Sequence, residues 1–442
     1  MKRTPAEDIV GFLNFSRDHR DRLNAIEKFT PRQWKRALQW LDDAGLAFYF
    51  LQKLKDTNAT DVVSPLPLSR LERNYACNQL RVADMSHRFD SINKQFTDAG
   101  VHYTAIKGFS LVPQFCPHAP LRYQADFDYL VEEESLPAAC RVLMEAGYGS
   151  KDSRSSKESI FITPGGQPSR GAEQYSPQAP HAVELHTEMW DSNMHRLPPI
   201  PNLFSVAEAR THHWNGFTFH GQTDEDAFLL QVLHACRHLF TQWIRASCLY
   251  EIGYFLHRRA SDTELWSGIE QRAGDSAVLR EFVVIVTELA ARLFAAPVPE
   301  LVQTWGARVR PAPRTWVEHY GRDWALCRLP VYEFSLFPPS KLALLLYNEY
   351  KIAPSTQESQ HQNKSSSSRT PRITTSIRRG PSPVLNRRWW NRHHLIRRAT
   401  FYVLAELRYI CEIPHWKWLN RASLRTVPAP WTSDSLQSKK AS

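Results

Sequence analysis

Hydrophobic residues recur at helical spacing through most of this chain and alternate with polar residues in a few short segments. The helical spacing is clearest where Pro67 begins a segment, apolar residues recur from Leu71 through Leu80 to Ile92, and Gly100 ends it. From residue 204 onward the pattern is again mainly helical. We therefore predict helices over residues 6–55, 67–99, 132–147, 224–256, 276–293, 336–347 and 387–419.

Alternating segments between these helices predict β-strands. In residues 181–189, Val183 and Leu185 fall on one face, whereas Glu184, His186 and Glu188 fall on the other, because successive side chains of a strand point to opposite sides. The elements together indicate a mixed α and β structure with a large helical portion. The strands are expected over residues 101–106, 125–131, 159–163 and 181–189.

Changes in composition divide the chain into five segments. Residues 354–383 are rich in Ser, Thr and Arg and have few apolar residues, so this part is expected to be disordered. The expected segments are an N-terminal helical segment (1–66), a mixed core (67–200), a helical domain (201–350), a disordered low-complexity linker (351–385) and a basic C-terminal helix and tail (386–442).

The positive charge of the chain is concentrated near its C-terminus. Hydrophobic residues make up 42% and charged residues 23%, as in ordinary globular proteins, and the net charge is +10. From Lys364 onward there are 16 Lys and Arg against 3 Asp and Glu, or +13, which leaves 10 − 13 = −3 for residues 1–363. A weakly acidic body argues against a duplex-binding groove, because neutralising phosphates requires clustered cations.

The cysteines and the N-terminal segment favour a cytoplasmic protein. Seven cysteines without a CxxC pair indicate neither a zinc ribbon nor a disulfide framework. Glu7 and Asp8 interrupt the apolar core that a signal peptide would need. The longest apolar stretches are too short to cross a bilayer, so no transmembrane segment is expected.

Candidate chemistry lies in the segment from His102 to Val131. Asp126 and Asp128 stand two residues apart in a predicted strand, so both carboxylates project from one face. Such a pair is stabilised by a cation, and carboxylate oxygens suit Mg²⁺, which commonly takes its remaining ligands from water and phosphate groups. Glu184 on the later alternating strand is a suitable third ligand. Phosphate chemistry is therefore the first hypothesis.

Several motifs occur in an order that resembles a known family. The chain reads K-G-F-S, then R-x-x-x-D-x-D-x-L-V, then a helix ending in Gly-Tyr, then V-E-L-H. From about Asn74 to about Phe255 it resembles the uncharacterised nucleotidyltransferase family, which is related to the polymerase-beta superfamily. The resemblance implies an α+β fold, with a small mixed β-sheet core, flanking helices and a large, mostly helical companion region.

The resemblance also implies an activity and roles for particular residues. The expected function is Mg²⁺-dependent transfer of a nucleoside monophosphate from a nucleoside triphosphate, such as ATP, to an unidentified hydroxyl acceptor, with two Mg²⁺ ions. Alternatives are phosphoryl transfer from the same site, or a catalytically inactive nucleotide- or partner-binding protein. Asp126, Asp128 and Glu184 would be the catalytic metal ligands, and Lys107, Gly108, Ser110 and Arg122 would bind the nucleotide.

Other polar residues have more than one interpretation. Arg122 could contact phosphate or form a salt bridge that positions the aspartates, and His186 could hydrogen-bond to a ligand or take part in catalysis. His234 and His238 share a helix face, but without a third ligand we favour helix packing over zinc. The role of Glu251 stays open, and Arg237 and Arg245 are further candidates for phosphate binding.

The basic C-terminal region suggests a second kind of function. A helix there could dock its apolar stripe on the body and leave its arginines in solvent. Alternatively, residues 387–398 could contact an anionic membrane, single-stranded nucleic acid or a protein partner. The cations and aromatic residues interleave as Arg387, Arg388, Trp389, Trp390, Arg392, Arg397 and Arg398, and the stripe consists of Ile396, Val403, Leu404, Leu407 and Cys411.

Overall fold

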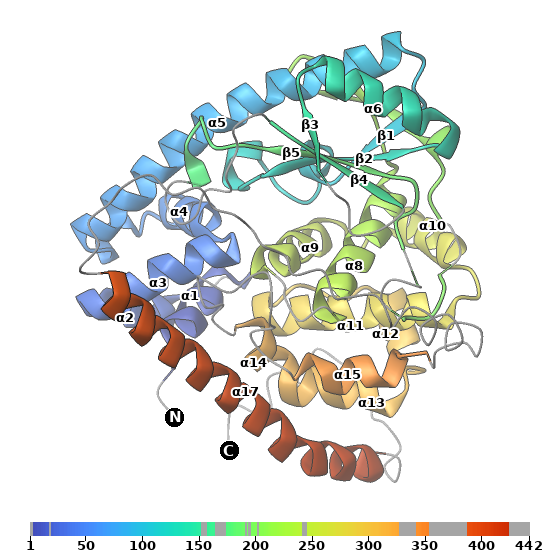
Figure 1. The fold of residues 1–442 in the computed structure, drawn as a ribbon. Coiled ribbons are helices and arrows are strands. Elements are labelled where there is room, and N and C mark those ends of the chain that lie inside the picture. The colour runs from blue at the N-terminus through green and yellow to red at the C-terminus, as the bar shows by residue number, and fades with distance from the viewer. Residues whose placement is uncertain are drawn as a thin grey trace.

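The protein is known here from a computed structural model in which a β-sheet lies between two groups of helices (Figure 1). One group covers the upper face of the sheet in Figure 1, and the larger group lies below it. The structure describes residues 3–16, 19–151, 157–163, 174–190, 192, 196–200, 203–240, 245–326, 342–352 and 387–423, with only the backbone for residues 387–402, 405 and 423.

The sheet has seven strands and is mixed, which confirms the predicted α+β class. The two central strands, β2 and β5, run parallel, and β2 pairs antiparallel with β1 on its other side. The order across the sheet is β3 (Gly149–Lys151), β4 (Glu158–Ile162), β5 (Ala182–His186), β2 (Asp126–Val131), β1 (Tyr103–Ile106), β7 (Phe217–Gly221) and β6 (Arg210–Trp214).

One face of the sheet is covered by α5 (Pro65–Asp98) and α6 (Leu136–Glu145). Phe89 and Phe96 of α5 pack on Tyr129 of β2, and all three are buried. The predicted helix over residues 67–99 is confirmed as a single element. Leu80, which the spacing placed in its apolar stripe, is instead 64% exposed, because that part of the helix turns the residue away from the sheet.

The remaining helices form one body around a continuous hydrophobic core. The N-terminal helices belong to this body, since the amide of Phe15 donates to the carbonyl of Phe294 at 2.7 Å. The larger helices are α1 (Pro5–Leu13), α2 (Arg20–Glu27), α3 (Pro31–Ala44), α4 (Ala47–Asp56), α8 (Asp224–Phe240), α9 (Ala246–Arg259), α10 (Thr263–Ala273), α11 (Ala277–Phe294), α12 (Glu300–Gly306), α13 (Pro311–Trp316) and α15 (Ala343–Tyr350).

The prediction of helix from residue 204 onward is wrong for β6 and β7. These strands form a hairpin at the edge of the sheet, and their connection places Asn215 and Gly216 at φ angles of 50° and 81°. Asn-Gly is the residue pair that such a tight turn favours. The sheet therefore extends to Gly221, while the division of the chain into domains stays a prediction. The low-complexity segment 354–383 lies outside the described residues.

The C-terminal helix α17 (Arg387–Ser423) forms as predicted but docks through a different face. Trp416 and Leu419 are buried, and the hydroxyl of Tyr320 donates to Glu412 at 2.9 Å. Leu404 and Leu407, from the stripe expected to dock, are exposed. The helix wheel explains the difference, because the buried residues lie about half a turn away from that stripe.

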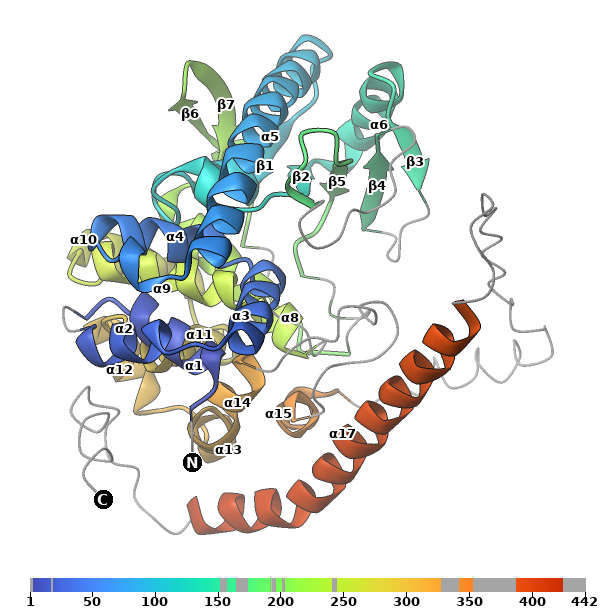
Figure 2. The same ribbon diagram turned by 90° about the vertical axis from the view of Figure 1, so that its left-hand side faces the viewer.

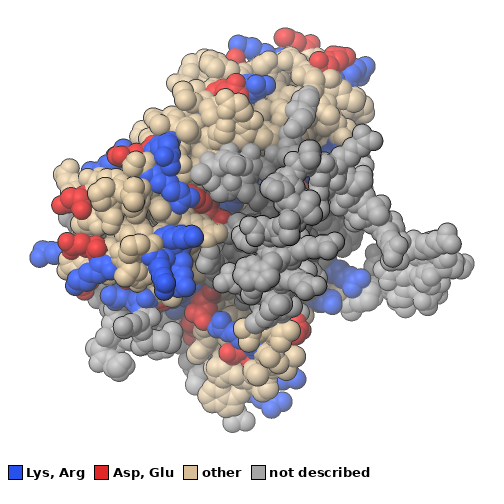
Figure 3. Space-filling model, turned by 60° about the vertical axis from the view of Figure 1, so that its left-hand side comes forward, with Lys and Arg blue, Asp and Glu red and all other residues tan. Residues whose placement is uncertain are grey.

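Two further findings concern the described residues as a whole. No helix among them is long and apolar enough to span a bilayer. No disulfide forms among Cys77, Cys116, Cys140, Cys236, Cys248 and Cys411. On the face seen in Figure 3, Lys and Arg lie among Asp and Glu over the described surface, as the weakly acidic composition of the body leads one to expect.

Candidate functional site

The central strands bring the predicted acidic residues together on the face of the sheet opposite α5. Asp128 of β2 is directly opposite Glu184 of β5, because these strands pair in parallel with that register. Asp126 lies two residues earlier on the same face. Strand β5 begins at Ala182, and the residues on its other face, Val183 and Leu185, are fully buried. The predicted alternation is thus confirmed.

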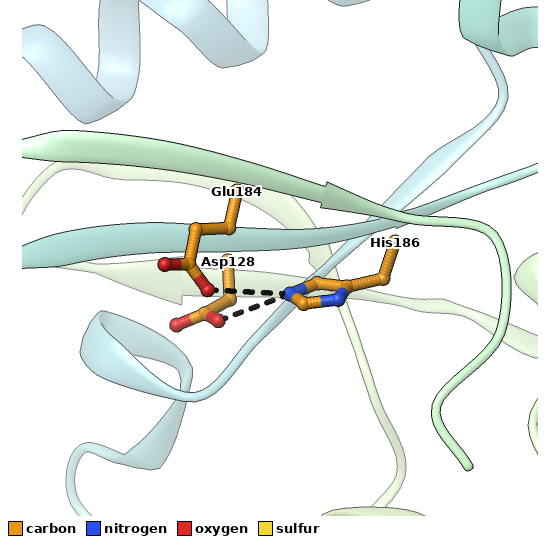
Figure 4. Close-up of side chains that lie close together, drawn as sticks. All are labelled: Asp128, Glu184 and His186. Carbon is orange, nitrogen blue, oxygen red and sulfur yellow. Dashed lines mark hydrogen bonds and ion pairs between the residues drawn. The ribbon is translucent and has the colours of Figure 1, made fainter. Parts of the chain in front are cut away.

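Asp128, Glu184 and His186 form a compact group whose side-chain oxygen and nitrogen atoms could bind a metal ion (Figure 4). Nε2 of His186 lies 3.3 Å from Oδ1 of Asp128 and 3.7 Å from Oε2 of Glu184. One ligand atom from each of the three residues lies within 4.8 Å of the others. Among the described residues, His, Cys, Asp and Glu side chains come together in threes or more, close enough to share a metal ion, at this group alone. Asp126 does not belong to it.

The electrostatics of this group are unbalanced without a cation. Burial, together with Asp128 and Asp126, raises the pKa of Glu184 to about 8. Burial and Asp128 also raise the pKa of Asp126. Burial acts the same way on Asp128, but Lys107 and His186 hold the pKa of that carboxyl well below its ordinary value. Burial and mutual repulsion therefore oppose the ionisation of Asp126 and Glu184, and a bound cation would relieve that repulsion.

Lys107 supplies the closest positive charge. Its Nζ lies 2.7 Å from Oδ1 of Asp128, and both side chains are buried. The backbone of Lys107 has φ 60° and ψ −165°, a conformation that costs a residue other than glycine about 1–3 kcal/mol. With this backbone conformation, the side chain of Lys107 reaches from the end of β1 to the carboxylate of Asp128. The surrounding fold has to compensate for the strain.

Gly108 allows the loop after Lys107 to pack closely against Gln124. It has φ 54°, and a Cβ atom there would lie 2.5 Å from Nε2 of Gln124. Gln124 in turn donates through Nε2 to the carbonyl of Asp126 at 2.9 Å. Ser110, predicted to contact phosphate, donates to the carbonyl of Lys107 at 2.7 Å and so closes the turn. The loop, the glutamine and the start of β2 are thus one packed unit.

Arg122 pairs with Glu251 rather than with the aspartates. Its Nε lies 3.1 Å from Oε1 of Glu251, which also accepts a 2.9 Å hydrogen bond from the hydroxyl of Tyr49. Glu251 is 2% exposed, and α9 carries it to the sheet from the helical body. This pair joins the segment before β2 to two helices and gives Glu251 a structural partner.

Other cations also act on the carboxylates from the helical side. Lys107, Arg122 and Arg245 each lower the pKa of Asp126, and the guanidinium of Arg245 lies 5.1 Å from the centre of the Tyr123 ring. The ring centres of His234 and His238 lie 4.4 Å apart in an edge-to-face contact. No third metal ligand joins them among the described residues. The favoured reading of these histidines as packing residues of α8 fits this contact.

Arg81, which was not among the predicted site residues, holds both central strands in place. Its guanidinium is buried and donates to the carbonyl of Gln124 before β2 and to those of Ala179 and Pro180 before β5. Asn78, one turn earlier on α5, donates to the carbonyl of Pro120 at 2.8 Å. The signal was the spacing, since these polar residues continue the buried stripe that begins with Met85 and Phe89.

One comparison with known proteins identifies a family. A family model described as "Uncharacterised nucleotidyltransferase" matches residues 30–295, which include the sheet, the loop at Lys107 and helices α8 and α9. No curated protein matches the chain.

Proposed function

The chain belongs to the uncharacterised nucleotidyltransferase family, and from this premise we propose that it transfers a nucleoside monophosphate from a nucleoside triphosphate to a hydroxyl acceptor. The reaction depends on divalent metal held by Asp126, Asp128 and Glu184. A single observation carries the proposal: Asp128 and Glu184 face each other on adjacent parallel strands, with ligand atoms within 4.8 Å.

The residues present fit a divalent cation. Carboxylate oxygens are the ligands that Mg²⁺ prefers, and the raised pKa of Glu184 reflects a carboxylate that a cation would stabilise. His186 adds a nitrogen at 3.7 Å from Glu184, a donor that Mn²⁺ accepts more readily than Mg²⁺. When bound, such ions neutralise charge on the triphosphate and favour the ionised form of the attacking hydroxyl.

The surrounding residues would bind and orient the nucleotide. Lys107 is close enough to Asp128 to exchange that carboxylate for a phosphate oxygen, and Gly108 lets the loop that carries Lys107 pack closely on Gln124. Arg122 and Arg245 add positive charge on the helical side of the carboxylates. Glu184 would also accept the proton of the attacking hydroxyl.

The direct test is incubation of the purified chain with labelled nucleoside triphosphates, Mg²⁺ or Mn²⁺ and a cell extract as the source of acceptor. We expect a labelled acceptor and release of pyrophosphate. Asp126→Asn and Asp128→Asn should each reduce the rate at least about 10³-fold, because each removes a charge that holds the metal. Asp98→Asn is the matched control, since Asp98 is exposed at the end of α5.

Product analysis separates the proposal from its alternatives. Phosphoryl transfer by the same residues would release nucleoside diphosphate instead of pyrophosphate. A binding protein without turnover would retain the triphosphate, and its metal-dependent affinity would still fall in Asp128→Asn. Full activity of either aspartate variant would contradict the assignment of the site.

A further inference from the structure

Helix α17 carries apolar side chains on two opposite faces, and within the described part of the chain the body buries those of one face. On the covered face, Trp416 and Leu419 are 6% and 8% exposed, and Glu412 accepts the hydrogen bond from Tyr320. Figure 2 shows the helix as a long rod at the edge of the molecule, passing α13. This contact fixes which side of the helix points outward.

The outward face forms a continuous apolar strip. Val403, Leu407 and Ile410 follow one another at spacings of four and three residues, so they lie on one side of the helix. Their exposed fractions are 56%, 51% and 54%, and those of Leu404 and Trp418 are 60% and 64%. Of the nine large hydrophobic residues exposed in the described part of the chain, these five belong to α17. Such a concentration on one helix marks an interaction surface.

The sequence of α17 carries a net positive charge. From Arg387 to Ser423 the sequence has 8 Lys and Arg against 2 Glu, a net charge of 8 − 2 = +6. Both glutamates, Glu406 and Glu412, are half-buried, whereas Lys417 and Arg421 are exposed. Arg408 is also exposed, but it pairs with Asp323 of the body at 2.7 Å. In the part of α17 with described side chains, every exposed charged group of Lys, Arg, Asp or Glu is therefore a cation.

We propose that the outward face of α17 lies on an anionic phospholipid surface. An apolar strip flanked by cations, with a tryptophan beside it, is the pattern of a helix that lies in the plane of a membrane interface. The aliphatic side chains enter the boundary between headgroups and acyl chains, while the cations contact phosphate groups. The body, held on the opposite face, stays outside the lipid with its candidate site.

Two other partners fit the surface less well. In a second copy of the chain, the same face would bring another +6 helix alongside, and like charges oppose that association. Single-stranded nucleic acid would use the cations and aromatic rings, but it offers no apolar surface to cover Val403, Leu404, Leu407 and Ile410. Lipid satisfies both the charge and the apolar strip.

The test is flotation of the full chain with vesicles of phosphatidylcholine alone or with 30% phosphatidylglycerol. At low salt we expect binding to the anionic vesicles, at least about tenfold weaker binding to the neutral ones, and release at 0.5 M salt. Leu404→Glu with Leu407→Glu should reduce binding at least about tenfold. Leu80→Glu is the matched control, because Leu80 is a leucine of α5 with 64% exposure.

A second pair of variants isolates the charge. Lys417→Gln with Arg421→Gln should weaken binding about fivefold for each cation removed. Lys35→Gln with Arg36→Gln on α3 removes the same charge from another exposed site and should leave binding unchanged. Circular dichroism of each variant verifies that the fold is intact.

Three outcomes would overturn the proposal. The first is absence of binding to anionic vesicles at low salt, and the second is equal binding by the Leu404→Glu, Leu407→Glu variant and the wild type. The third is a dimer in solution, measured by light scattering, that this variant dissociates while vesicle binding is absent. That result would assign the face to a second copy of the chain.

Discussion

The two faces of β2 and β5 are made from alternate residues of the same segments but are stabilised differently. On the face under α5, Phe127 and Tyr129 are almost fully buried in an aromatic cluster with Phe89. On the opposite face, Asp128 is buried and pairs with Lys107, while burial and the neighbouring carboxylates oppose the ionisation of Glu184. Burying carboxylates this way is costly, so a strand pair that served only packing would not retain them. The comparison shows where the fold gives up stability for chemistry.

The largest expected effect lies on the apolar face. Phe127→Ala would lower the free energy of unfolding by about 3–5 kcal/mol, because it leaves a cavity between Phe89 and Phe109. Asp126→Asn, on the neighbouring residue but the opposite face, should leave stability unchanged or raised, since burial already disfavours its charged form. Denaturant unfolding measures both, and equal destabilisation by the two variants would refute the contrast between the faces.

Arg122 and Glu251 provide the next largest effect. Arg122→Gln should cost about 3 kcal/mol of unfolding free energy, because it leaves the carboxylate of Glu251 buried without its ion-pair partner. Adding Glu251→Gln should restore much of the loss. If the double variant folds well but binds nucleoside triphosphate as weakly as Arg122→Gln alone, then Arg122 also contacts the nucleotide. Wild-type nucleotide affinity in the double variant would leave Arg122 with a structural role only.

Gly108 is constrained both by its close contact with Gln124 and by its positive φ, and the energetic costs of the two constraints can be separated. Gly108→Ala should cost about 2 kcal/mol, because the new Cβ meets Gln124 in addition to adopting a positive φ. Gly100→Ala is the matched control, with φ 65° and no atom within 4 Å of the new Cβ, and should cost about 1 kcal/mol. Thermal unfolding compares the two, and equal losses would show that Gln124 moves aside freely.

A further expected effect is a dependence of stability on pH, through the carboxyl of Glu184. Between the ordinary pKa of 4.5 and about 8, folded Glu184 holds a proton that the unfolded chain has released. The unfolding free energy of the metal-free protein should therefore fall as the pH rises through this interval. A divalent cation competes with the proton, so its affinity should rise by up to about tenfold per pH unit below pH 8. Denaturant unfolding at pH 5.5–8.5 and calorimetric titration with Mn²⁺ measure the two effects.

Glu184→Gln tests the origin of this pH dependence. Without the titrating carboxyl, the contribution of that group to the slope of unfolding free energy against pH disappears. A variant with the wild-type slope would assign the effect to other groups.

The sequence predicted the centre of the site because period-two alternation is a local property. The alternation over Asp126 to Val131 and Ala182 to His186 identified both the strands and the face that carries the carboxylates. The Asn215-Gly216 turn was equally local, but the strands beside it contain few aliphatic residues and resemble neither regular pattern strongly. Local spacing therefore predicts an element only where its apolar residues are frequent.

Contacts between segments far apart in the sequence could not be predicted from local patterns. Arg122 meets Glu251 across 129 residues, and Arg81 reaches the carbonyl of Ala179 across 98 residues. Neither spacing nor composition indicates which arginine of a helix lies over which carbonyl. In α17 the sequence indicated the stripe that includes Leu404 and Leu407, whereas packing near Tyr320 docks the face with Trp416 and Leu419.

The Arg81 contacts also affect how freely the chain can change in length between β4 and β5. Thr163 and His181, at the two ends of that connection, share a pair of hydrogen bonds of 3.3 Å, and Arg81 fastens the backbone at Ala179 and Pro180. A connection closed at its base can grow at small entropic cost, about 0.6 kcal/mol for each doubling of its length. New sequence could therefore be inserted between Thr163 and Gln174 without shifting the register of Asp128 and Glu184, which makes this connection a suitable place to engineer recognition of a chosen acceptor.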